Sequence, residues 1–187
     1  MGEMVNVQAS HVPLPTIDRA AFEELYLAYL PKVHNYICYR LGDVTTAEDV
    51  TAEVFERAFT SLPSYRSDRG AFSTWLFTIA HNLVANHLRA RKRRPAEVSL
   101  ETLPATAAAD GSPEAATTEA EQRRRIQACI QRLPEQQQEV LAMKFGGGMS
   151  NQEIAAAMRL KPNHVGVVLY RAVHALRLKL EEEEVQA

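Results

Sequence analysis

The chain has 187 residues, is 46% hydrophobic and 24% charged, and carries a formal net charge of −2. This is ordinary globular composition, sufficient for one domain or two small ones with a buried core. No apolar run reaches the roughly eighteen residues of a membrane span, and Cys38 and Cys129 lack the spacing of a zinc site, so both features are excluded and a reduced compartment is expected. The N-terminal extension, residues 1–17, lacks the pattern of a secretory signal, so we expect a cytoplasmic protein.

Charge is segregated along the chain, and the net charge hides this. Residues 18–58 carry eight acidic and four basic residues, whereas residues 71–94 carry five basic residues and no acidic one. Residues 95–121 carry six acidic residues and no basic one, residues 122–180 carry ten basic against three acidic residues, and the acidic tail 181–187 carries four glutamates. Two basic blocks separated by an acidic connector indicate two surfaces for a polyanion.

Two helices are predicted at the start of the chain. The first has apolar residues at helical spacing, namely Phe22, Leu25, Tyr26, Tyr29, Leu30, Val33, Tyr36, Ile37 and Leu41. Gly42 is its expected stop, and Pro31 is expected either to kink or to divide it. The second helix is expected to open with a capping box of Thr45 and Glu48, and its inner stripe is Val50, Val54 and Ala58.

The middle of the chain contains a loop, a helix and a linker. The segment "LPSYRSDRG" is rich in turn formers and is predicted as a loop. The most clearly amphipathic helix follows, with an inner stripe of Phe72, Trp75, Leu76, Ile79, Ala80 and Leu83. Residues 95–121 contain no aromatic residue and three prolines, so they cannot bury enough surface to offset the entropy of ordering. We expect them to form a flexible acidic linker.

Helical spacing resumes after the linker. One helix precedes Pro134, and a second follows it and ends at "GGG". Ser150 and Glu153 form a capping box for the helix "NQEIAAAM", and the turn "RLKP" leads to a last helix with an inner stripe of Val165, Leu169, Ala172 and Leu176. No segment shows convincing strand alternation. The predicted fold class is therefore all-α, with two small helical domains joined by a flexible acidic linker.

The last two helices form a candidate helix-turn-helix, in which the second helix lies in the major groove of DNA. An ordinary helical hairpin is the competing interpretation, but the net charge of +7 across residues 122–180 favours binding to phosphates. The predicted outer face of the last helix, with Val168 at its flank, is Asn163, His164, Gly166, Val167, Tyr170, Arg171 and His174.

A second candidate nucleic-acid surface lies on the helix that begins at Phe72. Opposite its apolar stripe, polar residues stand at i, i+4, i+7 and i+11, namely Asn82, Asn86, Arg89 and Arg93. Amides can read base edges and arginines can hold phosphates, so this face suits nucleic acid. Trp75 lies on the apolar stripe, and we expect it in the core and not in contact with bases.

An acidic stripe marks the second helix, where Asp49, Glu53 and Glu56 stand at i, i+4 and i+7. No histidine or further ligand cluster accompanies them, so no metal site is expected. A solvated helix face and a docking surface for a basic protein are both compatible with this stripe. The segment "FGGGMS" lacks the lysine and hydroxyl of a phosphate-binding loop, so no constellation supports an enzyme or a cofactor.

Four motifs in order, "AEDVTAEVFERAF", "FSTWLFTIAHNLVANHLRARKRR", "LPEQQQEVLAMKFGGGMSNQEIA" and the terminal helix, resemble a bacterial extracytoplasmic-function sigma factor of the sigma-70 superfamily. The resemblance covers about residues 18–180. It implies that residues 18–94 bind core RNA polymerase and open the minus-ten promoter element, and that residues 122–180 read the minus-thirty-five element as duplex. It also implies that the linker is threaded through the RNA-exit path of the polymerase, and that an anti-sigma protein controls the chain.

The resemblance implies roles for individual residues. Docking on the coiled coil of the polymerase's largest subunit is assigned to Asp49, Glu53, Phe55 and Glu56. Capture of a flipped non-template base and the adjacent single strand is assigned to Ser64, Tyr65, Arg66, Asn82, Asn86, Arg89 and Arg93. Contacts with the minus-thirty-five duplex are assigned to Lys161, Asn163, His164, Val167, Val168, Tyr170, Arg171 and His174.

The chain departs from the family pattern in two places. Arg159 stands where a glycine is usual in the turn, so we expect a differently built turn with Pro162 starting the last helix. Gly166, Val167 and Val168 stand where lysine, serine and arginine are common. One hypothesis is that the valines approach thymine methyl groups or allow close backbone approach. The other is that this domain reads its element weakly and relies on polymerase or an activator.

Two other functions compete with that of a sigma factor. A stand-alone helix-turn-helix transcriptional regulator would use the last two helices but would leave the acidic stripe without a role. A module that sequesters another regulator would use the acidic stripe but not the face formed by Asn82, Asn86 and Arg89.

Overall fold

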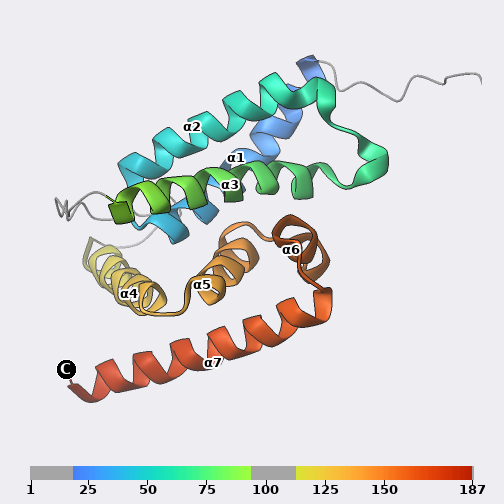
Figure 1. The fold of residues 1–187 in the computed structure, drawn as a ribbon. Helices are drawn as coiled ribbons and strands as arrows, with labels where there is room; N and C mark the ends of the chain where they lie inside the picture. The colour runs from blue at the N-terminus through green and yellow to red at the C-terminus, as the bar shows by residue number, and fades with distance from the viewer. Residues whose placement is uncertain (1–18, 94–112, 187) are drawn as a thin grey trace, which may run out of the picture.

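The computed structural model describes residues 19–93 and 113–186, and this part of the chain is helical and without strands (Figure 1). The N-terminal extension and most of the predicted linker, residues 1–18 and 94–112, lie outside the described residues. The expected all-α class is confirmed, with one group of helices on either side of the undescribed segment. We call residues 19–93 the first half and residues 113–186 the second half.

The first half consists of α1 (Arg19–Leu41), α2 (Val44–Ser61) and α3 (Phe72–Arg93). Two short 3₁₀ turns, η1 (Leu62–Ser64) and η2 (Ser67–Arg69), form the connection predicted as a loop. Pro31 lies inside α1 without dividing it, and Gly42 ends that helix with φ of 71°, a conformation that costs glycine little.

The start of α2 differs from the prediction. The helix begins at Val44, and the side chain of Asp43 accepts a hydrogen bond from the backbone N–H of Thr46 at 2.9 Å. The expected capping box of Thr45 and Glu48 is therefore wrong, because Asp43 already supplies an N-cap two residues earlier. This hydrogen bond is the main reason that the pKa of Asp43 lies below its usual value.

The inner stripes of the first half were predicted correctly. Val50, Val54 and Ala58 are buried on α2, and Phe72, Leu76, Ala80 and Leu83 are buried on α3. Trp75 and Ile79 are half-buried at the edge of the same core. The two helices bury these stripes against α1, which contributes fully buried Val33, Tyr36 and Ile37.

The second half consists of α4 (Pro113–Gln131), α5 (Glu135–Leu141), the π-helical turn η3 (Ala142–Gly146), α6 (Asn151–Met158) and α7 (Pro162–Gln186). Helix α4 begins at Pro113, so the last part of the predicted linker, which extended to residue 121, is helical. The linker prediction was wrong there because a helix needs no aromatic residue at its start, and proline is well suited to the first helical position.

The start of α6, the turn and the start of α7 were predicted correctly, but α7 continues to Gln186, through most of the predicted acidic tail. The capping box of Ser150 and Glu153 is present, and Pro162 begins α7. Arg159 ends α6 in the left-handed conformation, with φ of 55°. Arginine thus occupies a backbone conformation that normally favours glycine.

The two halves pack directly against each other. One hydrophobic cluster includes buried residues of α1, α2 and α3 together with Val140, Met143, Ile154 and Val165 of the second half. Helices α1 and α3 of the first half contact η3 and α6 of the second. Figure 1 shows the second half lying below α1 and α3, with α2 on the far side of the first half.

Candidate nucleic-acid interface

The outer face of α3 presents the polar residues that the sequence predicted. Asn82, Asn86, Arg89 and Arg93 are all exposed. Arg89 Nη2 donates to Asn86 Oδ1 at 2.8 Å, and its Nε donates to the carbonyl of Ala85 at 3.2 Å. These bonds hold one guanidinium beside an amide along the helix, an arrangement that can bind a phosphate next to a base edge.

The loop before α3 is built around Tyr65. Its ring packs at centroid distances of 5.6 Å from Phe72 and 5.2 Å from Trp75, and its hydroxyl donates to the carbonyl of Gly70 at 3.1 Å. Ser64 and Arg66 are exposed beside it. The aromatic cluster of Tyr65, Phe72 and Trp75 fixes this short loop. Ser64 donates a hydrogen bond to the carbonyl of Ser61 at 2.6 Å and Arg66 pairs with Asp68 at 3.8 Å, but both side chains stay exposed and accessible to a strand. Trp75 belongs to this aromatic cluster. It is partly buried against the core, so the prediction that it packs in the core is confirmed, with the residue at the edge of the core.

The outer face of α7 is more apolar than that of a usual DNA-reading helix. Tyr170 is 73% exposed and Val167 is 46% exposed. The remaining predicted residues, Lys161, Asn163, His164, Arg171 and His174, are also exposed. Gly166 is half-buried, with open space above it apart from the Asn151 side chain. Apolar and cationic groups therefore alternate along the surface of this helix.

The placement of Val168 on this surface is wrong. Its side chain is only 6% exposed and belongs to the hydrophobic core. The reason is helical geometry, since residue 168 lies three positions after Val165 and four before Ala172, which are both buried. Val168 thus supports the helix and does not face outward.

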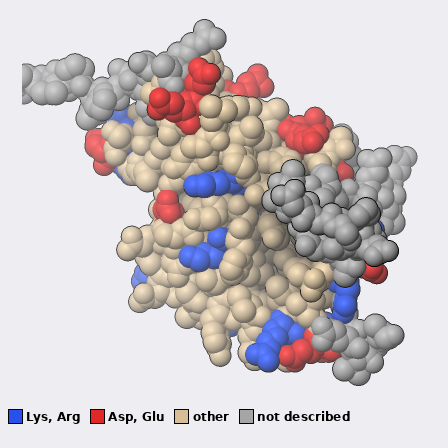
Figure 2. Space-filling model, turned by 180° about the vertical axis from the view of Figure 1, so that it is seen from behind, with Lys and Arg blue, Asp and Glu red and all other residues tan. Residues whose placement is uncertain are grey.

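The acidic stripe of α2 is accessible. Asp49 and Glu56 are exposed, and Glu53 accepts a hydrogen bond from Arg57 at 2.6 Å on the same helix. Figure 2 shows acidic side chains along the upper edge of the molecule, where α2 lies in Figure 1. The stripe therefore presents negative charge on the side of the first half that faces away from the second.

Phe55, which was expected to contact a partner from this stripe, is buried instead. Its ring packs edge-on against Tyr26 of α1 at 4.7 Å, and the residue is 6% exposed. Residue 55 lies beside Val54 and Thr51 on the inner side of α2, which explains the error.

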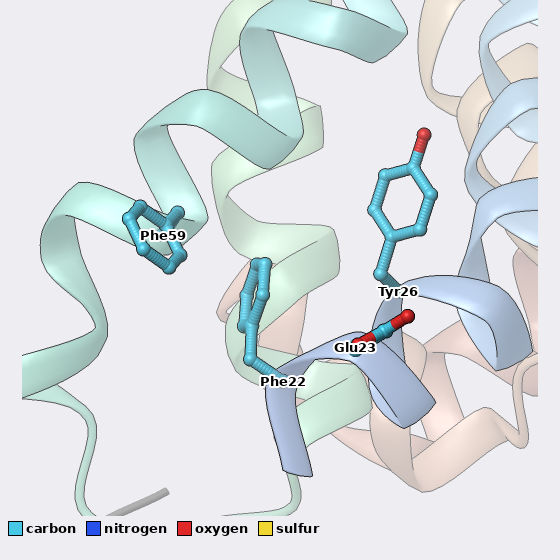
Figure 3. A pocket seen from close by; sticks show the side chains of 4 residues that line it. All are labelled: Phe22, Glu23, Tyr26 and Phe59. Carbon is cyan, nitrogen blue, oxygen red and sulfur yellow. The ribbon is translucent and has the colours of Figure 1, made fainter. Parts of the chain in front are cut away.

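An aromatic residue that the sequence analysis did not single out, Phe59, lies near the end of α2. Phe59 is 52% exposed and lines a shallow hollow of about 350 Å³ with Phe22, Glu23 and Tyr26. In Figure 3 the ring of Phe22 rises from α1 toward Phe59 on α2. The only available signal was the spacing of Phe59 three residues after Glu56, which extends the stripe by one turn.

A buried ionic network joins the two halves, and no sequence pattern indicated it. Glu139 of α5 accepts a hydrogen bond from Arg40 Nε at 2.6 Å and from the Tyr36 hydroxyl at 2.5 Å, and His81 Nδ1 lies 2.8 Å from the same carboxylate. Arg40 also donates to Gln138 Oε1 at 2.7 Å. Glu139 had been counted only as one of three acids in a basic block.

Burial and bonding oppose each other at Glu139. Burial alone would raise the pKa of this carboxyl, but the hydrogen bond with His81 and the positive charge of Arg40 outweigh it and hold the pKa below its usual value. The same burial, together with the charge of Glu139, raises the pKa of the Tyr36 hydroxyl well above its usual value. Glu139 is therefore an anion inside the interface, paired with a cation from the other half.

The described residues give little support to a metal site, a membrane span or a reactive thiol. Within residues 19–93 and 113–186 no group of three potential metal ligands comes together, and no helix is both long and apolar enough to cross a membrane. Burial, followed by the charges of Glu48 and Asp43, raises the pKa of Cys38 to about 11, so this thiol is a poor nucleophile.

Comparison with known families gives two matches in different parts of the chain. The model of sigma-70 region 2 matches residues 25–94, and the model of sigma-70 region 4 matches residues 123–176. These ranges contain the α3 face and the helix-turn-helix, respectively. The order of the two matches is the order predicted from the motifs.

Curated relatives cover most of the chain. The ECF RNA polymerase sigma factor BldN of Streptomyces coelicolor is 35% identical over 163 residues, and the match spans 87% of this chain but only 61% of the relative. The RNA polymerase sigma-H factor of Pseudomonas aeruginosa is 34% identical, with 88% of each chain covered. The ECF sigma factor SigW of Bacillus subtilis is 34% identical, covering 88% of this chain and 91% of the relative.

Solved structures share the fold. The sigma factor RpoE of Bartonella quintana, crystallised with the anti-sigma factor NepR, has a TM-score of 0.69 at 21% identity and covers 86% of this chain and 96% of its own. CnrH, solved in complex with the cytosolic domain of CnrY, has a TM-score of 0.66 at 23% identity and covers 88% and 90%. At these identities the likeness concerns the fold alone.

Proposed function

Because the chain belongs to the extracytoplasmic-function sigma factors of the sigma-70 family, we propose that it binds core RNA polymerase and directs promoter-specific transcription initiation. The observation that carries the proposal is the presence of both family regions in order, each with an exposed face suited to nucleic acid. A sigma factor directs initiation without an active site of its own, so no catalytic residue, cofactor or metal is proposed. The function places the protein with polymerase in the cytoplasm.

The first half reads the minus-ten element in this proposal. The loop residues Ser64, Tyr65 and Arg66 hold an unstacked base of the non-template strand, and the α3 face follows the adjacent strand. Support comes from the aromatic side chains of Phe72 and Trp75 that pack under the loop, and from the hydrogen bond between Arg89 and Asn86. Single strands are bound by aromatic and cationic groups in combination, because bases need a surface to stack on and phosphates need a positive charge.

The second half reads the minus-thirty-five element as duplex through α7. The exposed Val167 contacts a thymine methyl group, while Tyr170, Arg171 and their neighbours hold bases and phosphates. Val167→Asp is expected to abolish run-off transcription from the cognate promoter, because it replaces the apolar contact with the methyl group by a negative charge inside the groove of a polyanion. Unchanged output would remove this part of α7 from the reading surface.

The acidic stripe of α2 docks on a basic surface of core polymerase. Its support is the exposure of Asp49 and Glu56 on the side away from the second half. We further propose regulation by an anti-sigma protein, since both structural neighbours were solved in complexes, one of them with a named anti-sigma factor. The family matches lend no support to the stand-alone regulator as an alternative.

Reconstituted transcription tests the proposal. Purified protein and core polymerase should form a complex that starts transcription at a limited set of genomic sites, which sequencing of the transcript ends identifies. Arg89→Glu should lower run-off output at least tenfold without loss of polymerase binding, because it reverses one charge on the strand-binding face. Arg124→Glu, an exposed position on α4 outside every proposed contact, is the matched control. If the wild-type protein directs no initiation, the proposed function is wrong.

A further inference from the structure

A single non-glycine residue in the described part of the chain has a positive φ. Arg159 ends α6 with φ of 55° and ψ of 42°, a left-handed conformation in which a Cβ atom crowds the backbone. The turn requires this conformation. Leu160 N–H donates to the carbonyl of Ala155 at 2.8 Å and Arg159 N–H donates to that of Ala156 at 3.4 Å, as in a Schellman motif. Glycine would form the same hydrogen bonds at a lower conformational cost, so the turn explains the backbone of residue 159 but not its side chain.

The side chain of Arg159 has no structural role within the second half. It is exposed, and no carboxylate among the described residues pairs with it. Other exposed arginines are paired, since Arg57 meets Glu53 at 2.6 Å and Arg177 meets Glu181 at 2.8 Å. Unfavourable backbone conformations concentrate at functional sites, so a free cation held in one indicates a ligand for that cation.

Positive charge flanks an uncharged segment of α7. The first nine residues of this helix, 162–170, contain no lysine or arginine, and the exposed Val167 lies among them. Arg159 and Lys161 precede the segment and Arg171 follows it, and all three are exposed. An apolar helix surface can contact base edges but cannot neutralise phosphates. The affinity of α7 for a duplex must therefore come from its two cationic flanks.

The position of Arg159 in the turn brings it beside DNA phosphates. This step rests on the proposed function, in which the start of α7 lies in the major groove. Two residues separate Arg159 from Pro162, so their Cα atoms are at most about 11 Å apart. The groove is about 12 Å wide, and the two phosphate backbones form its walls. A long cationic side chain at this distance from the first turn of α7 is within reach of the nearer wall.

We propose that Arg159 is a phosphate anchor, which binds the duplex backbone beside the first turn of α7 and supplies, with Lys161, the charge that the start of this helix lacks. A guanidinium group suits this role because it can donate two parallel hydrogen bonds to one phosphate. The anchor fixes the register of α7 in the groove and leaves Val167 and Tyr170 to contact bases. Phosphates carry no sequence information, so the anchor strengthens binding to every duplex and selects none.

Arg159→Gly separates the role of the side chain from the requirements of the turn. Glycine adopts the left-handed conformation readily, so the midpoint of thermal unfolding should rise by about 2 °C. The same change removes the guanidinium group, so the affinity for a duplex should fall. Arg159→Lys keeps the positive charge in the same backbone conformation and should retain most of the affinity. A protein in which the turn and the anchor have opposite preferences at residue 159 should show exactly opposed changes in stability and in binding.

The matched control is Arg124→Gln, which removes one exposed positive charge from the same half of the chain. Helix α4, which carries Arg124, lies at the opposite end of the second half from the turn between α6 and α7 (Figure 1). Circular dichroism verifies that every variant retains its helices.

Fluorescence anisotropy of a labelled duplex of mixed sequence, titrated with the full chain, measures the anchor. The free chain is suitable because the outer face of α7 is exposed. Arg159→Gly should bind about fivefold to tenfold more weakly at about 0.1 M salt, and the slope of log affinity against log salt should become shallower by about 0.9, the value for one phosphate contact. Arg159→Lys and Arg124→Gln should keep the wild-type slope.

Three results would overturn the anchor. One is wild-type affinity and salt dependence in Arg159→Gly, and another is a wild-type chain that binds no duplex at low salt. The third is a lower thermal midpoint together with weaker binding in Arg159→Gly, which would make Arg159 a structural part of the turn. Reconstituted transcription separates this proposal from the function. A wild-type holoenzyme that starts no transcription counts against the function, whereas normal initiation with an unchanged salt slope in Arg159→Gly counts against the anchor alone.

Discussion

Two groups of carboxylates in this protein have opposite surroundings. Asp49, Glu53 and Glu56 form a stripe on the open side of α2, where water and salt screen them. Glu139 and Glu153 lie at the contact between the halves, and each accepts hydrogen bonds from the other half. The first group is available to a partner, whereas the second group is already bound within the chain.

The role of an acidic residue therefore depends on whether the fold buries it or leaves it in water. An exposed carboxylate contributes little to stability and can contribute to binding. A buried carboxylate makes its partners depend on it, because removal leaves a cation without compensation in the interior. The two groups should therefore respond in opposite ways to substitution, with large effects on stability at the interface and small ones on the stripe.

The largest effect is expected from Glu139→Ala. This change leaves Arg40, which is 2% exposed, buried without its anion, and we expect a loss of about 3–5 kcal/mol in the free energy of unfolding. Urea unfolding followed by circular dichroism measures it. Glu135→Ala, which removes an exposed ion pair from the same helix, should change stability by less than about 0.5 kcal/mol. Equal losses of stability in the two variants would show that burial does not distinguish Glu139 from Glu135.

The second largest effect on stability is expected from acidification, which should weaken the interface between the halves. The pKa of Glu139 is lower in the folded protein than in the unfolded chain, so its contribution is complete above the ordinary glutamate pKa of about 4.3 and is lost as the pH falls through the folded value. The stability of the wild type should decline in that range with a slope of at most about 1.4 kcal/mol per pH unit from this group. Glu139→Gln should show a shallower decline. Parallel curves for both proteins would mean that Glu139 does not govern it.

A moderate effect is expected at the second interface carboxylate. Ser73→Ala removes the donor to Glu153 while leaving the capping box of α6 intact, and it should cost about 1 kcal/mol. Chemical denaturation again provides the value. Ser67→Ala, at an exposed loop position, serves as the control with no expected change. A loss above that of Glu139→Ala would show that the Ser73 contact, and not the ionic network, dominates the interface.

The smallest effect on stability should come from the stripe. Asp49→Lys and Glu56→Lys are each expected to change the free energy of unfolding by less than about 0.5 kcal/mol, since both side chains are exposed. Their affinity for core polymerase should nevertheless fall at least tenfold, because each change reverses a charge on the docking surface. Equilibrium titration with labelled polymerase tests this. Wild-type affinity in both variants would separate the stripe from polymerase binding.

Local patterns made much of the fold predictable from sequence. Helical spacing of apolar residues identified the helices, because a helix must bury one stripe whatever its partner is. Ser150, Glu153 and Pro162 marked helix ends through bonds and dihedral preferences within a few residues. The face formed by Asn82, Asn86 and Arg89 was also predictable, since an exposed side follows once the buried side is known.

Errors arose where the outcome depended on small shifts of angle or on a competing cap. Val168 and Phe55 lie at the borders of their helical stripes, and neighbouring elements, not periodicity, decide whether such positions are buried. Asp43 caps α2 in place of Thr45 because the helix begins at Val44, where the Asp43 side chain accepts a hydrogen bond from the backbone N–H of Thr46. Each of these three errors concerns one turn of helix, whereas the linker error covers the start of α4 from Pro113, and all of them leave the architecture unchanged.

The sequence by itself determined which segments are helical and which surfaces carry charge, because both properties arise from neighbours along the chain. Only the tertiary structure decided that Glu139 meets Arg40, ninety-nine positions away, and that Gly146 touches α1. Charge counts cannot distinguish a solvated glutamate from a buried one, since the difference lies in desolvation by residues remote in sequence. The closed arrangement of the two halves is a property of that long-range contact.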